Sequence, residues 1–265
     1  MAEPLIVLQN ALRLVVTAAL LFGLWRGLAR TTLSPATRRT LWLAASAVYV
    51  AWLLVVEWFA LHGALARLPG VPAAIFLPLL LGLPILLRSK LVGRVLDATP
   101  WQWLVGVQVY RVFGAVFLVA WAAGQAPTIF ALPAGIGDVL TGLLALPVAF
   151  SGGRRRAVAW NLFGLLDLLN AITLGFLTAP GPTQLIVPDA PSIVANYPLV
   201  LIPAFAVPSS ILLHALSLRQ LRRRAGSVPS VSDSAPRAAR SATNAVADVA
   251  RLGRVNHPHD LQLDA

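Results

Sequence analysis

Seven stretches of about 20 mostly apolar residues follow one another along the chain, and each is long enough to cross the hydrocarbon core of a bilayer. They cover residues 5–26, 41–62, 71–88, 101–123, 129–150, 158–178 and 198–218. Of the 265 residues, 58% are hydrophobic and 12% are charged, whereas soluble domains carry about 25% charge. A water-soluble fold cannot bury this much apolar surface. The sequence therefore predicts an all-α fold, a polytopic membrane bundle of seven transmembrane helices.

The basic residues outside these stretches are distributed very unevenly. Fourteen lie in the first, third and fifth loops or near the end of the last stretch, namely Arg26, Arg30, Arg38, Arg39, Arg88, Lys90, Arg94, Arg154, Arg155, Arg156, Arg219, Arg222, Arg223 and Arg224. The loops on the other side hold one basic residue, Arg67. Because loops rich in arginine and lysine stay on the cytoplasmic side, we expect the N-terminus outside and the C-terminus in the cytoplasm.

The composition changes after Arg224, where Ser, Pro, Ala and scattered charges replace the apolar runs. This pattern is typical of disorder, because too few large apolar residues remain to build a core. We therefore expect a transmembrane domain over residues 1–224 and a disordered cytoplasmic tail over 225–265. The tail motif "HPHD", His257 to Asp260, resembles a metal-ligand cluster but has no partner motif, so no metal site is predicted.

Composition also excludes several classes of protein. The chain has no cysteine, which rules out disulfides, thiol catalysis and iron–sulfur clusters. The net charge of +11 does not indicate nucleic-acid binding, because the basic residues lie in short loops rather than on one face. A retinal pigment needs a lysine inside a span, and the only lysine, Lys90, lies in a predicted loop. No cofactor is expected, and the predicted partners are lipid, a small solute or proton, and a membrane partner subunit.

Five ionisable residues fall inside the predicted spans: Arg13, Glu57, Arg111, Asp138 and Asp167. A charge facing lipid at mid-bilayer costs about 2.5–3.5 kcal/mol on insertion scales, so such residues should face the bundle interior and pair there. Counting from the span ends places Arg111, Asp138 and Asp167 near the midplane on three consecutive spans. We expect one arginine shared by two aspartates, and a second pair between Arg13 and Glu57.

The central group has a charge deficit, because two carboxylates face one guanidinium. A proton on one carboxyl group would restore neutrality, since burial and a like-charged neighbour favour the neutral form. A bound cation or amine would do the same. The group is therefore a candidate proton, cation or ligand site. The polar residues expected to support it are Gln108, Thr141, Asn161 and Asn170.

The fifth span carries Pro133, Gly135 and Gly137 just before Asp138. These residues are candidates for a helix break, because proline and glycine weaken a helix. A broken helix beside a midplane acid is typical of transporter binding sites. The alternative is close helix packing, which small residues also permit. In the last span, Pro198, Pro203 and Pro208 predict a bend.

The segment "RVFGAVFLVAWAAGQAPTIFALPAGIGDVLTGLLALPVA", residues 111–149, resembles uncharacterised bacterial multi-pass inner-membrane proteins. The resemblance is best in the fourth and fifth spans. It implies the cytoplasmic membrane of a bacterium and carries no site residue with it.

Several functions remain open at this point. The leading hypothesis is a small-solute or proton/cation-coupled transporter, and the alternative is a non-catalytic accessory subunit, receptor or scaffold. An architectural role for the charged residues is also open, as is a carrier built from two three-span repeats. A hydrolase is disfavoured, because "GIGD" has no partner "YD" and Ser209 and Ser210 have no GxSxG elbow. His62 and His214 are expected to lie at opposite membrane interfaces.

Overall fold

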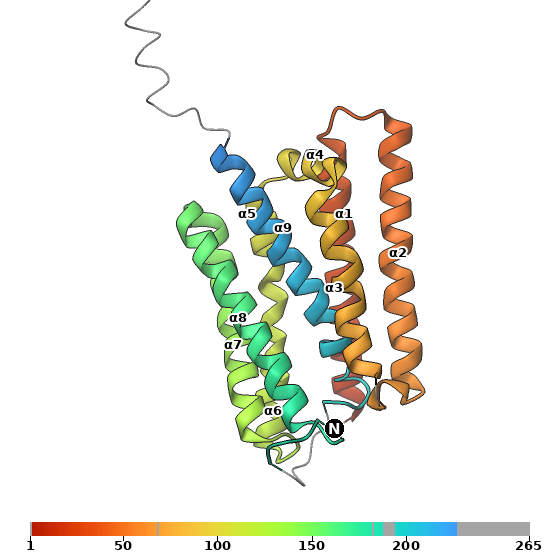
Figure 1. The fold of residues 1–265 in the computed structure, drawn as a ribbon, viewed down its shortest axis with the longest axis vertical. Helices are drawn as coiled ribbons and strands as arrows, with labels where there is room; N and C mark the ends of the chain where they lie inside the picture. The colour runs from red at the N-terminus through yellow and green to blue at the C-terminus, as the bar shows by residue number, and fades with distance from the viewer. Residues whose placement is uncertain (1, 68, 182, 188–193, 227–265) are drawn as a thin grey trace, which may run out of the picture. The chain divides into compact units, whose positions relative to one another are not determined.

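A computed structural model of the chain describes residues 2–67, 69–181, 183–187 and 194–226 (Figure 1). Contacts divide the chain into one unit over Met1–Arg222 and a second over Arg223–Ala265. The tail expected over 225–265 begins inside the last helix, which ends at Gly226, and the rest of it falls outside the described residues.

The described residues form helices, with no strand among them. The first four α-helices are α1 (Ala2–Ala29), α2 (Pro35–Leu61), α3 (Gly70–Arg88) and α4 (Lys90–Ala98), with a short 3₁₀ helix η1 (Ala64–Ala66) after α2. The fourth predicted span is composite, consisting of α5 (Trp101–Gly106), a 3₁₀ helix η2 (Val107–Gly114) and α6 (Ala115–Ala122). It is followed by α7 (Thr128–Ser151), α8 (Arg154–Thr178), a π-helical turn η3 (Ile202–Ala206) and α9 (Val207–Gly226).

Among the residues that the structure describes, six helical segments are long and apolar enough to cross a membrane. Their ranges are Pro35–Leu61, Gly70–Arg88, Trp101–Ala122, Thr128–Ser151, Arg154–Thr178 and Ile202–Arg224. These correspond to the second to seventh predicted spans, whereas the first falls on α1, which is helical but is not one of the six. The prediction of a helical protein with several membrane-spanning helices is thus confirmed, whereas the predicted number of seven spans is not shown.

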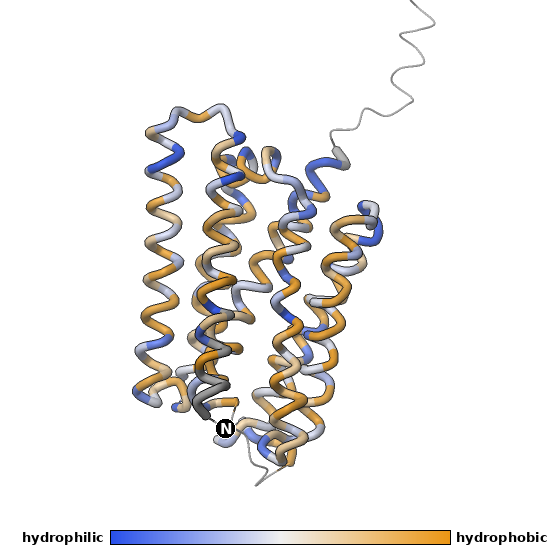
Figure 2. The backbone as a smooth tube through the Cα atoms, turned by 180° about the vertical axis from the view of Figure 1, so that it is seen from behind, coloured by the Kyte–Doolittle hydropathy of each residue, from blue (hydrophilic) through white to orange (hydrophobic). Residues whose placement is uncertain are grey.

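The surface of the helices fits a lipid environment. Figure 2 shows mainly hydrophobic residues along the helices and strongly hydrophilic ones gathered at their ends. Large apolar side chains point outward over the whole length, for example Val48 with 72% exposure, Leu80 with 71% and Leu166 with 66%. In water this exposed apolar surface would be unfavourable, but in a bilayer it faces acyl chains of the same polarity.

Local sequence determines where several helices begin. α2 starts at Pro35 because Ser34 caps it, with the Ser34 hydroxyl accepting a hydrogen bond from the Thr37 amide at 3.2 Å. Ser89 caps α4 in the same way through the Val92 amide. The indole of Trp42 in α2 donates to the Leu21 carbonyl of α1 at 3.0 Å and so holds these two helices together.

The central helix of the bundle is α7, which packs most extensively against η2 and α8. It is a continuous α-helix from Thr128 to Ser151. The helix break predicted at Pro133, Gly135 and Gly137 is therefore wrong. The two glycines serve close approach instead: a Cβ atom at Gly135 would lie 2.7 Å from the Leu118 side chain, and one at Gly137 would overlap the Asp167 carboxylate.

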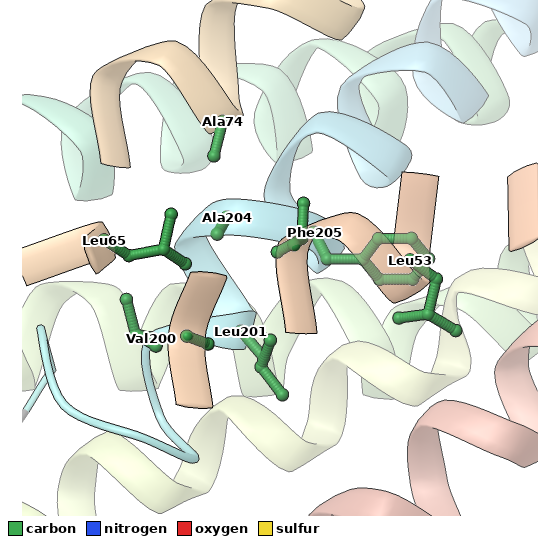
Figure 3. Packing of buried hydrophobic residues seen from close by; sticks show 9 residues of the cluster. Leu53, Leu65, Ala74, Val200, Leu201, Ala204 and Phe205 are labelled. Carbon is green, nitrogen blue, oxygen red and sulfur yellow. The ribbon is translucent and has the colours of Figure 1, made fainter. Parts of the chain in front are cut away.

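Regular α-helix is instead interrupted in two other spans, the fourth and the last. The fourth span changes from α-helix to 3₁₀ helix over η2, and the last span begins with the π-helical turn η3 around Pro203. The bend predicted for the last span stays a prediction, and the π-helical turn around Pro203 is the interruption observed there. Figure 3 shows η3 packed within a cluster of buried apolar side chains from α2, η1, α3 and the chain leading into η3. Mid-helix changes of this kind often mark functional segments.

Candidate functional site

A charged centre lies where η2, α7 and α8 meet, and consists of Arg111, Asp138 and Asp167. The Arg111 Nη2 atom lies 2.6 Å from Asp138 Oδ1, and Nε donates to the same oxygen at 2.8 Å. Nη2 also donates to Asp167 Oδ2. The exposed fractions of the three side chains are 2%, 14% and 6%. The structure therefore brings together the three residues that the sequence predicted to share one site.

Neutral groups complete the surroundings of the guanidinium. Its Nη1 atom donates to the Gly164 carbonyl at 3.3 Å and lies 3.2 Å from His214 Nε2. A guanidinium has no acceptor atom, so Nε2 is the acceptor and the imidazole proton resides on Nδ1. That proton is donated to Asn161 Oδ1 at 2.9 Å, and the Asn161 amide donates to Ser217 Oγ at 3.0 Å. His214 is therefore neutral and adds no charge to the centre.

Three glycines provide the space that the charged centre occupies. A Cβ atom at Gly137 of α7 would overlap the Asp167 carboxylate, and one at Gly114 at the end of η2 would overlap the Asp138 side chain. At Gly164 of α8 it would lie 2.5 Å from the His214 ring and 3.1 Å from Arg111 Nη1. Each glycine comes from a different helix, so the three helices approach closely only because all three side chains are absent.

The second predicted pair is also present. Arg13 Nη2 of α1 lies 2.8 Å from Glu57 Oε1 of α2, with exposed fractions of 12% and 21%. The Nε and Nη1 atoms of Arg13 are buried with no hydrogen-bond partner among the described residues. The pair therefore neutralises the charge of Arg13 while leaving part of its donor capacity unused.

The four predicted supporting residues have different positions. Asn161 bonds His214 directly, as described above. The Thr141 hydroxyl donates to the Gly137 carbonyl at 2.8 Å, one turn from Asp138. Gln108 is fully buried, and both its polar side-chain atoms lack a partner among the described residues. Asn170 is exposed on α8 and lies outside the centre, so its predicted support of the site is wrong.

Two cavities border the charged centre. A small cavity of about 100 Å³ touches both Arg111 and Asp138, and Arg13 also lines it. A large cavity of about 360 Å³ touches Asp138 and reaches Arg67, which directly follows η1, and Thr178, the last residue of α8. Asp138 thus borders both spaces, together with the apolar residues Leu168, Ile202 and Val207.

The small cavity also carries two hydroxyl pairs. The Tyr110 hydroxyl lies 2.6 Å from Ser210 Oγ, and the Tyr49 hydroxyl lies 3.3 Å from Ser209 Oγ. Its remaining wall is apolar and partly aromatic, with Phe113 and Phe205 among the lining residues. Such a space combines one accessible carboxylate, several hydroxyl oxygens and ring faces.

Sequence reasoning assigned no role in the centre to Tyr110, Ser210 or His214. His214 was expected at an interface because the last span was predicted to end at residue 218. In the structure α9 extends to Gly226, which places His214 well inside the helix, and its side chain is fully buried. The available signal was the occurrence of Ser209, Ser210 and His214 in the otherwise apolar first half of α9, residues 207–216. Among the described residues, no group of three or more His, Cys, Asp or Glu side chains suits a metal ion.

The chain belongs to the family described as "Domain of unknown function (DUF8737)", which matches residues 68–222. The matched range contains the whole charged centre and His214, but neither Arg13 nor Glu57. No curated protein and no solved structure matches the chain.

Proposed function

We propose that this protein is a small-solute or proton/cation-coupled transporter, with Asp138 and Asp167 as the proton or cation sites and Arg111 as their counter-ion. One observation carries the proposal: the guanidinium of Arg111 is shared by two carboxylates, and one of these, Asp138, borders two cavities. A purely architectural ion pair needs one acid for one base and no adjoining space.

The charges of the centre favour a mobile positive charge. With both carboxylates ionised, one guanidinium leaves one negative charge in excess, and His214 contributes none. An uncompensated charge in a low-dielectric interior is strongly unfavourable. A proton or a cation that enters and leaves through the neighbouring cavities would compensate it, and this exchange is the elementary step of coupled transport.

The proposal includes a membrane topology. If α1 crosses the membrane in addition to the six apolar segments, the chain has seven spans, with the N-terminus outside and the C-terminus in the cytoplasm. The fourteen basic residues in the first, third and fifth loops and near the end of the last span support this orientation. The resemblance of residues 111–149 to bacterial multi-pass proteins supports the cytoplasmic membrane of a bacterium as the location. In this orientation the large cavity would open toward the outside.

The accessory, receptor or scaffold function receives less support. An accessory subunit that binds its partner through intramembrane charges should keep one of them unpaired within the chain. Arg13 pairs with Glu57, and the surplus carboxylate charge of the centre lies on Asp138 or Asp167. Both side chains contact Arg111 and are only 14% and 6% exposed, so neither presents its charge to a partner subunit. No observation on the described residues favours this alternative over transport.

The test is a flux assay in liposomes that contain the purified protein and a trapped pH-sensitive dye. Gradients of candidate small solutes are imposed one at a time, and movement of protons is followed by fluorescence. We expect at least one solute to drive proton movement in the parent protein and in Asp97→Asn, a carboxyl-to-amide control at an exposed position on α4. Asp138→Asn should abolish the coupled signal. Flux of equal size in Asp138→Asn would contradict the proposal.

A further inference from the structure

The small cavity has the chemistry of a site for a positively charged organic group. The Asp138 carboxylate contacts Arg111 through Oδ1 only, and the residue borders the cavity. Tyr49, Tyr110 and Ser210, which each carry a hydroxyl, line the same cavity. A primary ammonium group has three donors, which one carboxylate oxygen and two hydroxyl oxygens can accept.

The size and apolar wall of the cavity favour an ammonium group with a short apolar tail over a metal ion. A metal cation needs several oxygen ligands at close range, whereas few oxygen-bearing side chains line this cavity and most of its wall is apolar. Tyr49 and Phe205 stack with ring centroids 5.2 Å apart, and Phe113 lines the same space. Aromatic faces of this kind stabilise organic cations. A volume of about 100 Å³ admits one small solute.

The other charged groups near the cavity leave one charge to be compensated. Arg13 of α1 is neutralised by Glu57 of α2 at 2.8 Å. Arg111 of η2 compensates Asp167 of α8 or Asp138 of α7, but not both. His214 of α9 is neutral, because its Nε2 atom accepts from Arg111. The complete set therefore carries one net negative charge, which one positive charge balances.

From this arrangement we infer that the small cavity binds a small primary ammonium ion, and that each ammonium bound displaces one proton from the charged centre. The inference rests on the proposed function and specifies its solute class and its coupling. Before binding, the surplus proton sits on a carboxyl oxygen of the centre. On binding, that O–H bond breaks, the proton passes to water, and the carboxylate accepts hydrogen bonds from the incoming ammonium group. The ammonium ion arrives already protonated, and no covalent bond forms.

The large cavity provides a route to this site. It also borders Asp138. The linings of the two cavities share three further residues, Leu168, Ile202 and Val207. Ile202 and Val207 lie at the two ends of the π-helical turn η3. The ammonium ion would therefore pass from the large cavity to Asp138 beside these three shared apolar side chains.

The experiment measures binding and proton release together on the whole chain in detergent. Ethylammonium chloride is titrated into weakly buffered protein with a pH-indicator dye, and binding is measured in parallel by calorimetry at several pH values. We expect release to approach one proton per ethylammonium bound at the pH where the centre holds its extra proton. Asp138→Asn should weaken binding on the order of thirtyfold, since it removes a buried charged partner, and should abolish release. Asp97→Asn is the matched control and should behave as the parent protein.

Three outcomes would overturn the inference: no ethylammonium binding, binding without proton release at every pH, or equal binding and release in Asp138→Asn. A second measurement covers the case in which that variant fails to fold. The chain has no cysteine, so Ala206→Cys places a single thiol on the cavity wall, at a lining residue without a polar side-chain atom. Saturating ethylammonium should slow its reaction with a small thiol reagent about tenfold or more, as occupancy of about nine-tenths or higher requires. An unchanged labelling rate would overturn the inference.

The two proposals fail in different ways. Ammonium binding with proton release but no flux in liposomes would retain the site and remove the transport function. Flux driven by another solute, without ethylammonium binding in detergent, would retain transport and remove the ammonium site.

Discussion

Neutralising either aspartate of the charged centre should cost little stability, whereas neutralising both should cost much more. Asp138→Asn keeps the shape of the side chain and leaves Arg111 paired with Asp167. The surplus negative charge then disappears, so we expect the free energy of unfolding to change by less than about 1 kcal/mol. Asp167→Asn should behave in the same way, because Asp138 still contacts the guanidinium through Nε and Nη2.

The double variant strands the charge of Arg111, whose side chain is only 2% exposed. Removing the partners of a buried charge costs about 3–5 kcal/mol. An opposite charge at about 4 Å contributes about 4 kcal/mol at an effective dielectric constant near 20, which agrees with this range. After subtraction of up to about 1 kcal/mol for each single variant, the coupling between the aspartates should be at least about 1–3 kcal/mol.

The assay is reversible unfolding in mixed detergent micelles, with the free energy of unfolding measured for the parent, both single variants and the double variant. Asp97→Asn tests the effect of losing an exposed carboxylate elsewhere and should stay within about 1 kcal/mol of the parent, the most that an exposed ion pair usually contributes. The reasoning is refuted if each single variant loses more than 2 kcal/mol and the double loses their sum. Both carboxylates would then be required as structural charges, and neither would be surplus.

Three further substitutions, the first with a matched control, test side-chain contacts inside the bundle. Gly137→Ala should cost about 1–3 kcal/mol by overpacking against Asp167, while Gly175→Ala, whose added Cβ would be 3.6 Å from its nearest neighbour, should be neutral; equal unfolding free energies would contradict this. His214→Leu leaves two buried polar groups without their partner and should cost about 1–3 kcal/mol in the same assay, and a neutral result would mean that the imidazole network does not stabilise the centre. The Gln220 amide donates to the carbonyls of residues 96 and 99, so Gln220→Leu should speed hydrogen exchange at the end of α4, and unchanged exchange would show that this contact is dispensable.

Much of the fold could be predicted from the sequence, because bilayer thickness converts apolar length directly into helices. The predicted spans 71–88, 101–123 and 129–150 agree with helical segments Gly70–Arg88, Trp101–Ala122 and Thr128–Ser151. The internal geometry of the fourth span could not be predicted in this way. Its 3₁₀ segment η2 contains no proline, and its backbone lies close to α7, where a Cβ at Gly142 would be 2.5 Å from the Val112 amide nitrogen.

The charged centre could be predicted because ionisable residues in a membrane must find partners. The depth of each residue within its span was enough to select Arg111, Asp138 and Asp167 as partners. Which face of a helix points inward could not be predicted, since lipid-facing and packed faces are both apolar. Asn170 illustrates the difference. The buried residues of α8 include Ala157, Asn161, Gly164 and Leu168, and a position such as 170 is turned about 120° from the middle of that face.

The glycines near Asp138 show why a local pattern was misinterpreted. In water, proline and glycine next to an acid predict an interrupted helix, because the exposed backbone gains hydrogen bonds to solvent. In a bilayer the backbone of α7 has no such alternative and remains helical through Gly135 and Gly137. Without a side chain, Gly137 instead admits the Asp167 carboxylate from α8. The same residues that seemed to open the helix therefore allow the second carboxylate to reach Arg111, and this second carboxylate creates the surplus charge on which the proposed exchange depends.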